Sequence, residues 1–91
     1  MLAANYSTRF KKDIKLVEKR GYAMQKIFDV MVAIQNESKL DERLKAHALI
    51  GDYTGYMECH IEPDWLLVYK IDEFAKEVYF ARTGTHSDLF S

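Results

Sequence analysis

The 91-residue sequence has little cysteine, proline or glycine: one Cys, one Pro and four Gly. The lone Cys59 cannot form an internal disulfide or a cysteine-rich metal site, which favours a reducing compartment. No apolar run reaches about 18 residues, and the sequence does not open with the pattern of a secretory signal. We therefore expect one soluble, cytoplasmic domain over residues 1–91 that does not associate with membranes.

The net charge of −1 conceals an uneven distribution of charge along the chain. Residues 1–26 carry seven Lys or Arg and two Asp or Glu, whereas residues 27–91 carry six basic and twelve acidic side chains. A basic first helix is suited to a polyanion, and Lys12 and Lys15 are then its predicted contacts. The alternative is an ordinary solvated helix face.

The spacing of apolar residues predicts a mixed α+β domain. Phe10, Ile14 and Val17 form one stripe of a helix from Thr8 to Arg20, and Gly21 is suited to end that helix. The order β-α-α-β-β-β, with short connections, predicts an antiparallel sheet packed against an N-terminal helical pair. The other expected elements are a strand over residues 1–6, a helix from Tyr22 to Glu37, strands over residues 56–61, 65–71 and 77–82, and a short helical turn after Gly84.

Polar residues cluster where the expected strands end. His60 and Asp64 flank the single proline, directly before an apolar strand, and Arg82 and His86 show the same four-residue offset after the last strand. His47 lies in the loop that precedes these strands. Because the ends of adjacent strands in such a sheet can converge, we expect these residues to form one site.

Histidines with a carboxylate and an arginine are suited to acid–base cleavage of a phosphodiester. RNA cleavage through its own 2′-OH needs a base for that hydroxyl, an acid for the leaving 5′ oxygen and a cation for the developing charge. Histidine titrates near neutrality, and arginine binds phosphate in a bidentate manner. Trp65 and Phe90 could stack on RNA bases, or they could instead pack in the core.

Two other chemistries are disfavoured by the same residues. Three histidines and Asp64 could bind zinc, but the sequence has no His-x-x-x-His helix, and the segment from His60 to Asp64 spans a proline. Cys59 as a nucleophile is disfavoured because the alternation of residues 56–61 turns it toward the core. The sequence thus favours chemistry without a metal or another cofactor.

Two blocks carry several rare residues in a fixed order. The block from Gly55 to Ile71 reads GYMECHIEPDWLLVYKI, and the block from Arg82 to Phe90 reads RTGTHSDLF. Earlier segments add the pattern Phe10-x-Lys12-Asp13-x-Lys15, the helix end Lys19-Arg20-Gly21, and His47-x-Leu49 before Gly51. Together they closely resemble the YafQ-type toxins of the RelE superfamily, from bacterial type II toxin–antitoxin systems, over nearly the whole chain.

This resemblance implies a RelE-like fold and a metal-free, ribosome-dependent mRNA endonuclease. Cleavage through the RNA's own 2′-OH is then expected to give a 2′,3′-cyclic phosphate and a 5′-OH. The resemblance also implies a cognate antitoxin as the partner, with operator DNA bound only through the toxin–antitoxin complex. The implied roles are acid–base catalysis by His47, His60, Asp64 and His86, phosphate binding by Arg82, and positioning of mRNA by Trp65 and Phe90.

Two readings without nuclease activity stay open at this point. One is a RelE-fold toxin that binds another target, as the gyrase-inhibiting branch does, since this fold does not determine the activity. The other is a domain that only binds a partner chain through its apolar surface. The polar residues at the strand ends favour the nuclease, because a pure binder does not need titratable groups there.

Overall fold

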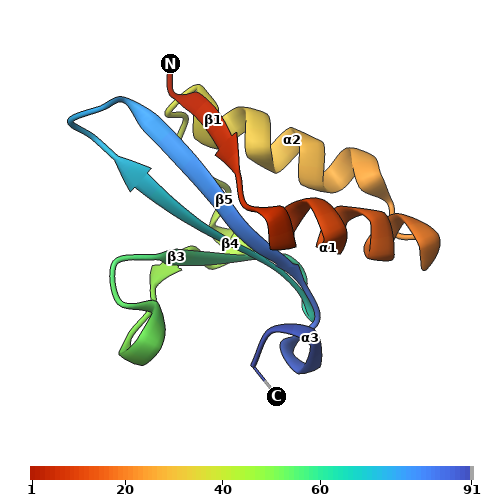
Figure 1. Ribbon diagram of the computed structural model, residues 1–91. Helices are drawn as coiled ribbons and strands as arrows, with labels where there is room; N and C mark the ends of the chain where they lie inside the picture. The colour runs from red at the N-terminus through yellow and green to blue at the C-terminus, as the bar shows by residue number, and fades with distance from the viewer. Residues whose placement is uncertain (91) are drawn as a thin grey trace.

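The computed structural model describes residues 1–90 and shows one mixed sheet with helices packed on it (Figure 1). No helix among these residues is both long enough and apolar enough to cross a membrane. The α+β class and the order of the expected elements are confirmed. The elements are β1 (Ala3–Tyr6), α1 (Thr8–Lys19), α2 (Met24–Gln35), β2 (His47–Ala48), β3 (Met57–Glu62), β4 (Trp65–Asp72), β5 (Glu77–Gly84) and α3 (His86–Phe90), with the 3₁₀ turns η1 (Glu42–Leu44) and η2 (Gly51–Tyr53) in the connection before β3.

The sheet has the strand order β1-β5-β4-β3-β2, and it corrects the expected antiparallel arrangement in two places. β1 pairs with β5 in the parallel direction, while the other pairs are antiparallel. A parallel pair needs a long crossover connection, and the two helices and the following strands supply one here. The second correction is β2, which adds an edge strand to β3 where the sequence predicted only a loop around His47.

Local chemistry favours the start of α1, whereas α2 begins after Ala23 without a side-chain cap. The Ser7 hydroxyl accepts a hydrogen bond from the backbone N–H of Phe10 at 2.8 Å, so it caps the N-terminus of α1 as predicted. The same hydroxyl donates to the carbonyl of Ala81 at 2.6 Å, which ties the start of α1 to β5. α2 begins at Met24, two residues later than predicted.

The core lies mainly between the helices and one face of the sheet. Phe10 and Val17 of α1 and Ile27 of α2 pack there against Leu67 and Phe80 of the central strands. The opposite face carries a smaller apolar cluster of Leu66, Val68, Ala81 and Leu89, with Leu49, Tyr53 and Tyr56 packed beside it. Neither α1 nor α2 covers this second face, which we call the open face, so polar side chains on it remain within reach of a ligand.

Candidate functional site

Strand register places several of the predicted site residues in one line across the open face. His47 on β2 lies opposite Glu58 on β3, Glu58 lies opposite Val68 on β4, and Val68 lies opposite Arg82 on β5. Directly opposed residues in an antiparallel pair point to the same face of the sheet. His60 lies two residues after Glu58 on β3, and residues two apart on a strand point to the same face of the sheet. His60 therefore shares the open face with Glu58.

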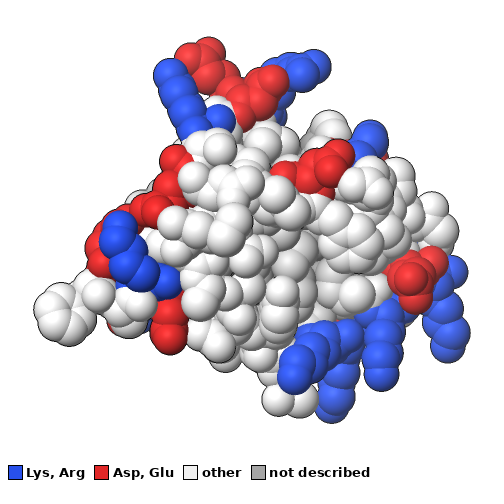
Figure 2. All heavy atoms as spheres, turned by 90° about the horizontal axis from the view of Figure 1, so that it is seen from above, with Lys and Arg blue, Asp and Glu red and all other residues white. Residues whose placement is uncertain are grey.

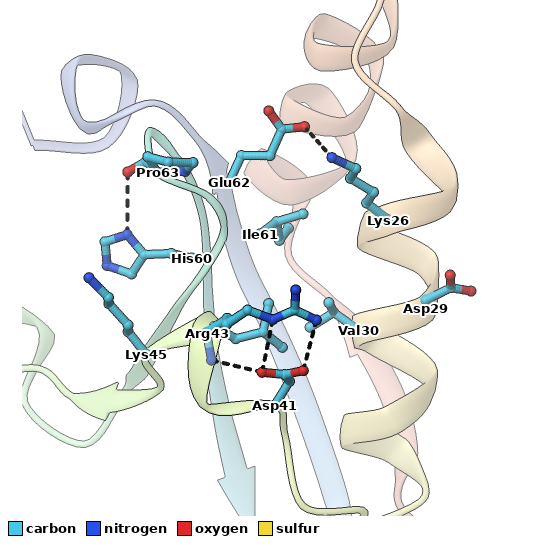
Figure 3. Close-up of a pocket in the computed structure, with 11 residues that line it drawn as sticks. Lys26, Asp29, Val30, Asp41, Arg43, Lys45, His60, Ile61, Glu62 and Pro63 are labelled. Atoms are coloured by element: carbon cyan, nitrogen blue, oxygen red, sulfur yellow. Dashed lines mark hydrogen bonds and ion pairs between the residues drawn. The ribbon is translucent and has the colours of Figure 1, made fainter.

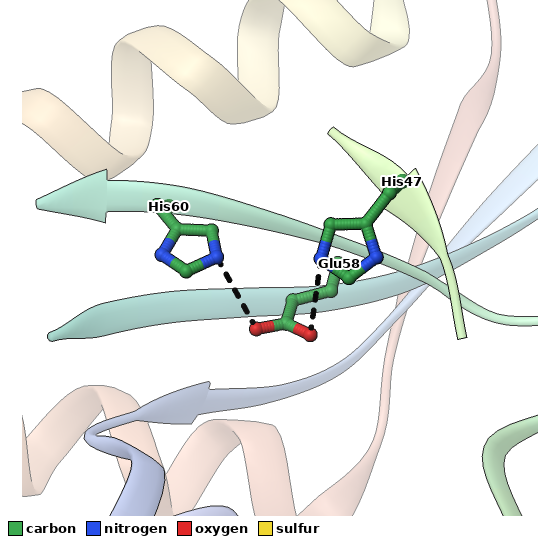
Figure 4. A group of neighbouring side chains, drawn as sticks. All are labelled: His47, Glu58 and His60. Carbon is green, nitrogen blue, oxygen red and sulfur yellow. Dashed lines mark ion pairs between the residues drawn. The ribbon is translucent and has the colours of Figure 1, made fainter. Parts of the chain in front are cut away.

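The Glu58 carboxylate lies between two of the predicted catalytic histidines (Figure 4). Its two oxygens are 3.6 Å from Nε2 of His47 and 3.6 Å from Nε2 of His60. Glu58 is only 5% exposed, although it carries a carboxylate. Carboxylates are almost never buried unless they are paired, so the two imidazoles account for its position. Glu58 was not among the predicted site residues.

His86 and Asp64 form the other half of the site, at the ends of β5 and β3. The Asp64 carboxylate accepts hydrogen bonds from the backbone N–H of His86 at 2.9 Å and from its Nδ1 at 2.5 Å. These bonds hold the pKa of Asp64 below its usual value, so the carboxylate is charged at neutral pH. The predicted convergence of the two strand ends is therefore present in the structure.

The three imidazoles form a continuous line, with His60 in the middle. Its ring centroid is 6.2 Å from that of His47 and 5.8 Å from that of His86. We call these rings, together with Glu58 and Asp64, the histidine row. A single phosphodiester laid along the row could reach two imidazoles at once, which is the arrangement that concerted acid–base catalysis needs.

A network at the C-terminus of the chain holds His86 in the row. Asp88 receives two hydrogen bonds from the Arg20 guanidinium, at 2.6 and 3.0 Å, and one from the backbone N–H of Thr85 at 2.9 Å. The Arg20 guanidinium holds the pKa of Asp88 well below its usual range. α3 is therefore clamped to the end of α1. Gly84 makes this packing possible, since a Cβ there would lie 2.8 Å from the Asp88 carboxylate.

We predict that Gly84→Ala both destabilises the protein and slows its reaction. Gly84 has a φ of 153°, at which side chains are strained, and the clash with Asp88 would disturb the segment that carries His86. We expect a loss of stability of about 1–3 kcal/mol. Gly21→Ala is the matched control, because Gly21 also has a positive φ of 81° but nothing lies within 4 Å of the added Cβ.

Thermal unfolding, together with assays of the RNA cleavage expected from the sequence, checks this prediction in both variants. Gly21→Ala should lower the melting temperature through backbone strain alone and leave the rate at saturating substrate unchanged. Equal activity in the two variants would show that the Gly84 packing does not position His86.

Arg82 lies in the line of the row, but its guanidinium is engaged by an acidic side chain from α1. Nε of Arg82 donates to Asp13 at 2.7 Å, and a terminal nitrogen donates to the other Asp13 oxygen at 3.2 Å. Asp13 also accepts the backbone N–H of Thr83 at 3.1 Å. Arg82 is 8% exposed. At the site it is therefore one partner of a largely buried ion pair with Asp13 and not a free cation.

The four predicted substrate-binding residues lie in three different environments: the core, the exposed end of α3, and the outer surface of α1. Trp65 is 2% exposed, and its indole N–H donates to the Thr83 hydroxyl at 2.9 Å, which favours core packing over base stacking. Phe90 is 45% exposed near the end of α3, with its ring 5.7 Å from that of Tyr53. Lys12 and Lys15 are exposed on α1, the helix that packs on the other face of the sheet, so the structure does not bring them to the row.

The row also contains a group that could hold a metal ion. One ligand atom each from His47, Glu58 and His60 lies within 4.8 Å of the others. Two imidazoles and a carboxylate are ligands that zinc and copper accept. Cys59 is not part of this group: it is buried on the helix side, and burial raises the pKa of its thiol to about 12. The predicted exclusion of a cysteine nucleophile fits this position.

Solved structures place the chain among small α+β toxin domains. It superposes on the crystal structure of YafQ from Escherichia coli strain BL21(DE3) with a TM-score of 0.93 and 38% identity, over 100% of both chains. The toxin in the E. coli DinJ–YafQ complex gives 0.90 and 40%, again over 100% of both chains. A metal-bound toxin from Helicobacter pylori gives 0.93 and 36%, over 99% of this chain and 100% of that one.

Sequence comparison identifies the family. The model of the YafQ family, described as bacterial toxins of type II toxin–antitoxin systems, matches residues 2–91. The chain is also 43% identical over 86 residues to the mRNA interferase toxin YafQ of E. coli strain K12, covering 93% of this chain and 91% of that protein. The chain therefore belongs to the YafQ family of toxins, as the two sequence blocks predicted.

Proposed function

We propose that this YafQ-family protein is an endoribonuclease toxin that cleaves mRNA on the ribosome. The observation that best supports this is the histidine row: three imidazoles and two carboxylates, brought to one open face from four separate segments of the chain. The mRNA interferase activity of the 43% identical E. coli relative supports the same substrate.

The proposed reaction is transphosphorylation within the RNA. One imidazole accepts the proton of the 2′-hydroxyl, whose oxygen then attacks the adjacent phosphorus. A second imidazole donates a proton to the 5′ oxygen as the P–O bond breaks. The products are a 2′,3′-cyclic phosphate and a 5′-OH, and no water is consumed in this step. The carboxylates of Glu58 and Asp64 orient the rings and stabilise the imidazolium form that appears after proton transfer.

Arg82 and Phe90 take supporting parts in this proposal. Asp13 and the Asp88 carbonyl hold the Arg82 guanidinium in place beside the row. Its fixed positive charge can therefore stabilise the charge that develops on the phosphate, without reorganisation during the reaction. The half-exposed Phe90 ring, beside Tyr53, offers a face on which a base can stack. Trp65 acts from the core, because its hydrogen bond to the Thr83 hydroxyl holds the start of β4 next to Asp64.

We also propose that a cognate antitoxin holds the toxin inactive in the cytoplasm, as DinJ forms a complex with YafQ in E. coli. A groove of about 420 Å³ lies between α1 and α2. Tyr6, Phe28 and Val32 are large apolar residues that line it, and each is more than two-fifths exposed. Lys11 and Lys15 stand at its edge. An amphipathic, acidic antitoxin segment matches such a groove in both polarity and charge.

Cleavage is expected to persist when metal is removed. A metal ion bound by His47, Glu58 and His60 would occupy imidazole lone pairs that the acid–base reaction needs. The test compares cleavage by toxin treated with EDTA and desalted with cleavage by untreated toxin, both added to intact ribosome complexes in their normal magnesium. Loss of activity on EDTA treatment, restored by stoichiometric zinc, would contradict the metal-free reaction.

A further inference from the structure

A second groove opens directly beside the histidine row (Figure 3). It has a volume of about 760 Å³ and lies between α2 and the segment of η1. His60 lines its wall, so a strand bound across the row can continue into the groove without leaving the protein surface. Residues of α2, including Lys26 and Val30, form the opposite wall.

Two of the three cations that line this groove are paired with carboxylates, and the third carboxylate, Asp29, accepts a hydrogen bond from the Gln25 amide at 2.7 Å. Arg43 is bound to Asp41 through 3.1 and 3.3 Å contacts, and Lys26 lies 3.3 Å from Glu62. Lys45 is exposed, and its ammonium has no ion-pair or hydrogen-bond partner within residues 1–90. Figure 3 shows the Lys45 side chain extending toward the His60 ring.

The backbone conformation of Lys45 is a second feature that distinguishes it. Lys45 has a φ of 50° and a ψ of 46°, the left-handed conformation that glycine or asparagine normally takes. Glu37 and Lys76 share a positive φ, but these two residues form an ion pair with each other at 3.4 Å. Lys45 ends η1, where its backbone N–H donates to the Glu42 carbonyl at 3.0 Å, and unlike Lys76 its side chain forms no ion pair within residues 1–90. A left-handed residue other than glycine costs stability, and such positions cluster at functional sites.

The histidine row lacks a free positive charge for an RNA phosphate. Glu58 and Asp64 are acidic, and Arg82 is already paired with Asp13. We infer that Lys45 is a substrate-binding residue, which contacts an RNA phosphate beside the scissile one and directs the strand into the groove along α2. The inference rests on the proposed function, because it names where the RNA of that reaction lies.

Lys45→Gly tests this inference, because it removes the ammonium and relieves the backbone strain together. We expect its melting temperature to equal or exceed that of the wild type. Its kcat/KM for mRNA cleavage on ribosome complexes should fall on the order of 10- to 100-fold, the scale of one charge-assisted hydrogen bond. Lys45→Arg should keep most of the activity. Lys76→Gly is the matched control, a lysine of the same left-handed conformation at the β4–β5 turn, and its activity should not change.

The dependence on salt separates a phosphate contact from a structural effect. Loss of one contact with single-stranded nucleic acid should reduce the slope of log kcat/KM against log salt by about 0.7. Wild-type kcat/KM in Lys45→Gly, an unchanged salt slope, or an equal loss in Lys45→Arg would overturn the inference and leave the proposed function standing. A wild-type protein that cleaves no mRNA would overturn both.

Discussion

Replacement of His60 by Ala is expected to slow mRNA cleavage on the order of 10²- to 10⁴-fold, the usual contribution of a general acid or base. His60 is the middle ring of the row, within 6.2 Å of both neighbouring imidazoles, and it also contacts Glu58. His86→Ala and Asp64→Ala should cause losses of the same order or smaller, since Asp64 acts on His86. The measurement is the single-turnover rate on mRNA in ribosome complexes.

These losses should occur in folded protein. His86 and Asp64 are exposed and His60 is half-buried, so none of them belongs to either apolar cluster. Circular dichroism and thermal unfolding of the triple variant, in which His60, Asp64 and His86 are all replaced by Ala, should resemble those of the wild type. Phe74→Ala is a suitable control, because this side chain is fully exposed at the β4–β5 turn and should affect neither property. A folded triple variant that cleaves at the wild-type rate would rule out the assignment.

Expression of the chain alone is expected to arrest growth, and co-expression of its antitoxin should restore it. Figure 2 shows one group of Lys and Arg side chains at the lower right of the view, with others at the top and left, around a broad surface without charge. α1 carries Lys11, Lys12 and Lys15, and the apolar groove lies between it and α2. Substitution of these three lysines by Glu should weaken the rescue, because an acidic antitoxin segment would then be repelled.

Two measurements separate antitoxin binding from RNA binding in this experiment. The association rate of purified toxin and antitoxin should fall as salt rises for the wild type, and much less for the triple Glu variant. The toxicity of the triple Glu variant, expressed without antitoxin, tests the other predicted role of Lys12 and Lys15, which is contact with RNA. Lys39→Glu, on an exposed residue after α2, is the charge control. Full rescue and an unchanged association rate in the triple Glu variant would contradict this docking surface.

Much of the site was predictable because it depends on strand alternation and strand ends. Alternation over residues 56–61 correctly placed Cys59 toward the core and His60 on the polar face. The same alternation places Glu58 on the polar face with His60, and this pattern could have identified Glu58 as a site residue. A lone glutamate on a polar strand face is usually solvated, however, and its burial depends on His47, which reaches it from an edge strand of two residues.

The features that sequence could not predict depend on long-range contacts. The parallel pairing of β1 with β5 joins residues more than 70 positions apart, and nothing local specifies its direction. The same holds for the Asp13–Arg82 ion pair, which changes Arg82 from an expected free cation into a fixed one. The sequence could not decide whether Trp65 packs in the core or stacks on an RNA base, because an aromatic residue at the start of a strand fits both environments.

Primer extension on a defined mRNA in a translating extract tests the central claim most directly. Wild-type protein should produce new 5′ ends within the translated part of the message, with a 5′-OH on the downstream fragment and a 2′,3′-cyclic phosphate on the upstream one. The ends should be absent with the His60→Ala variant and with an inhibitor that prevents ribosome loading. Intact mRNA in the presence of folded wild-type protein and active ribosomes would contradict the account.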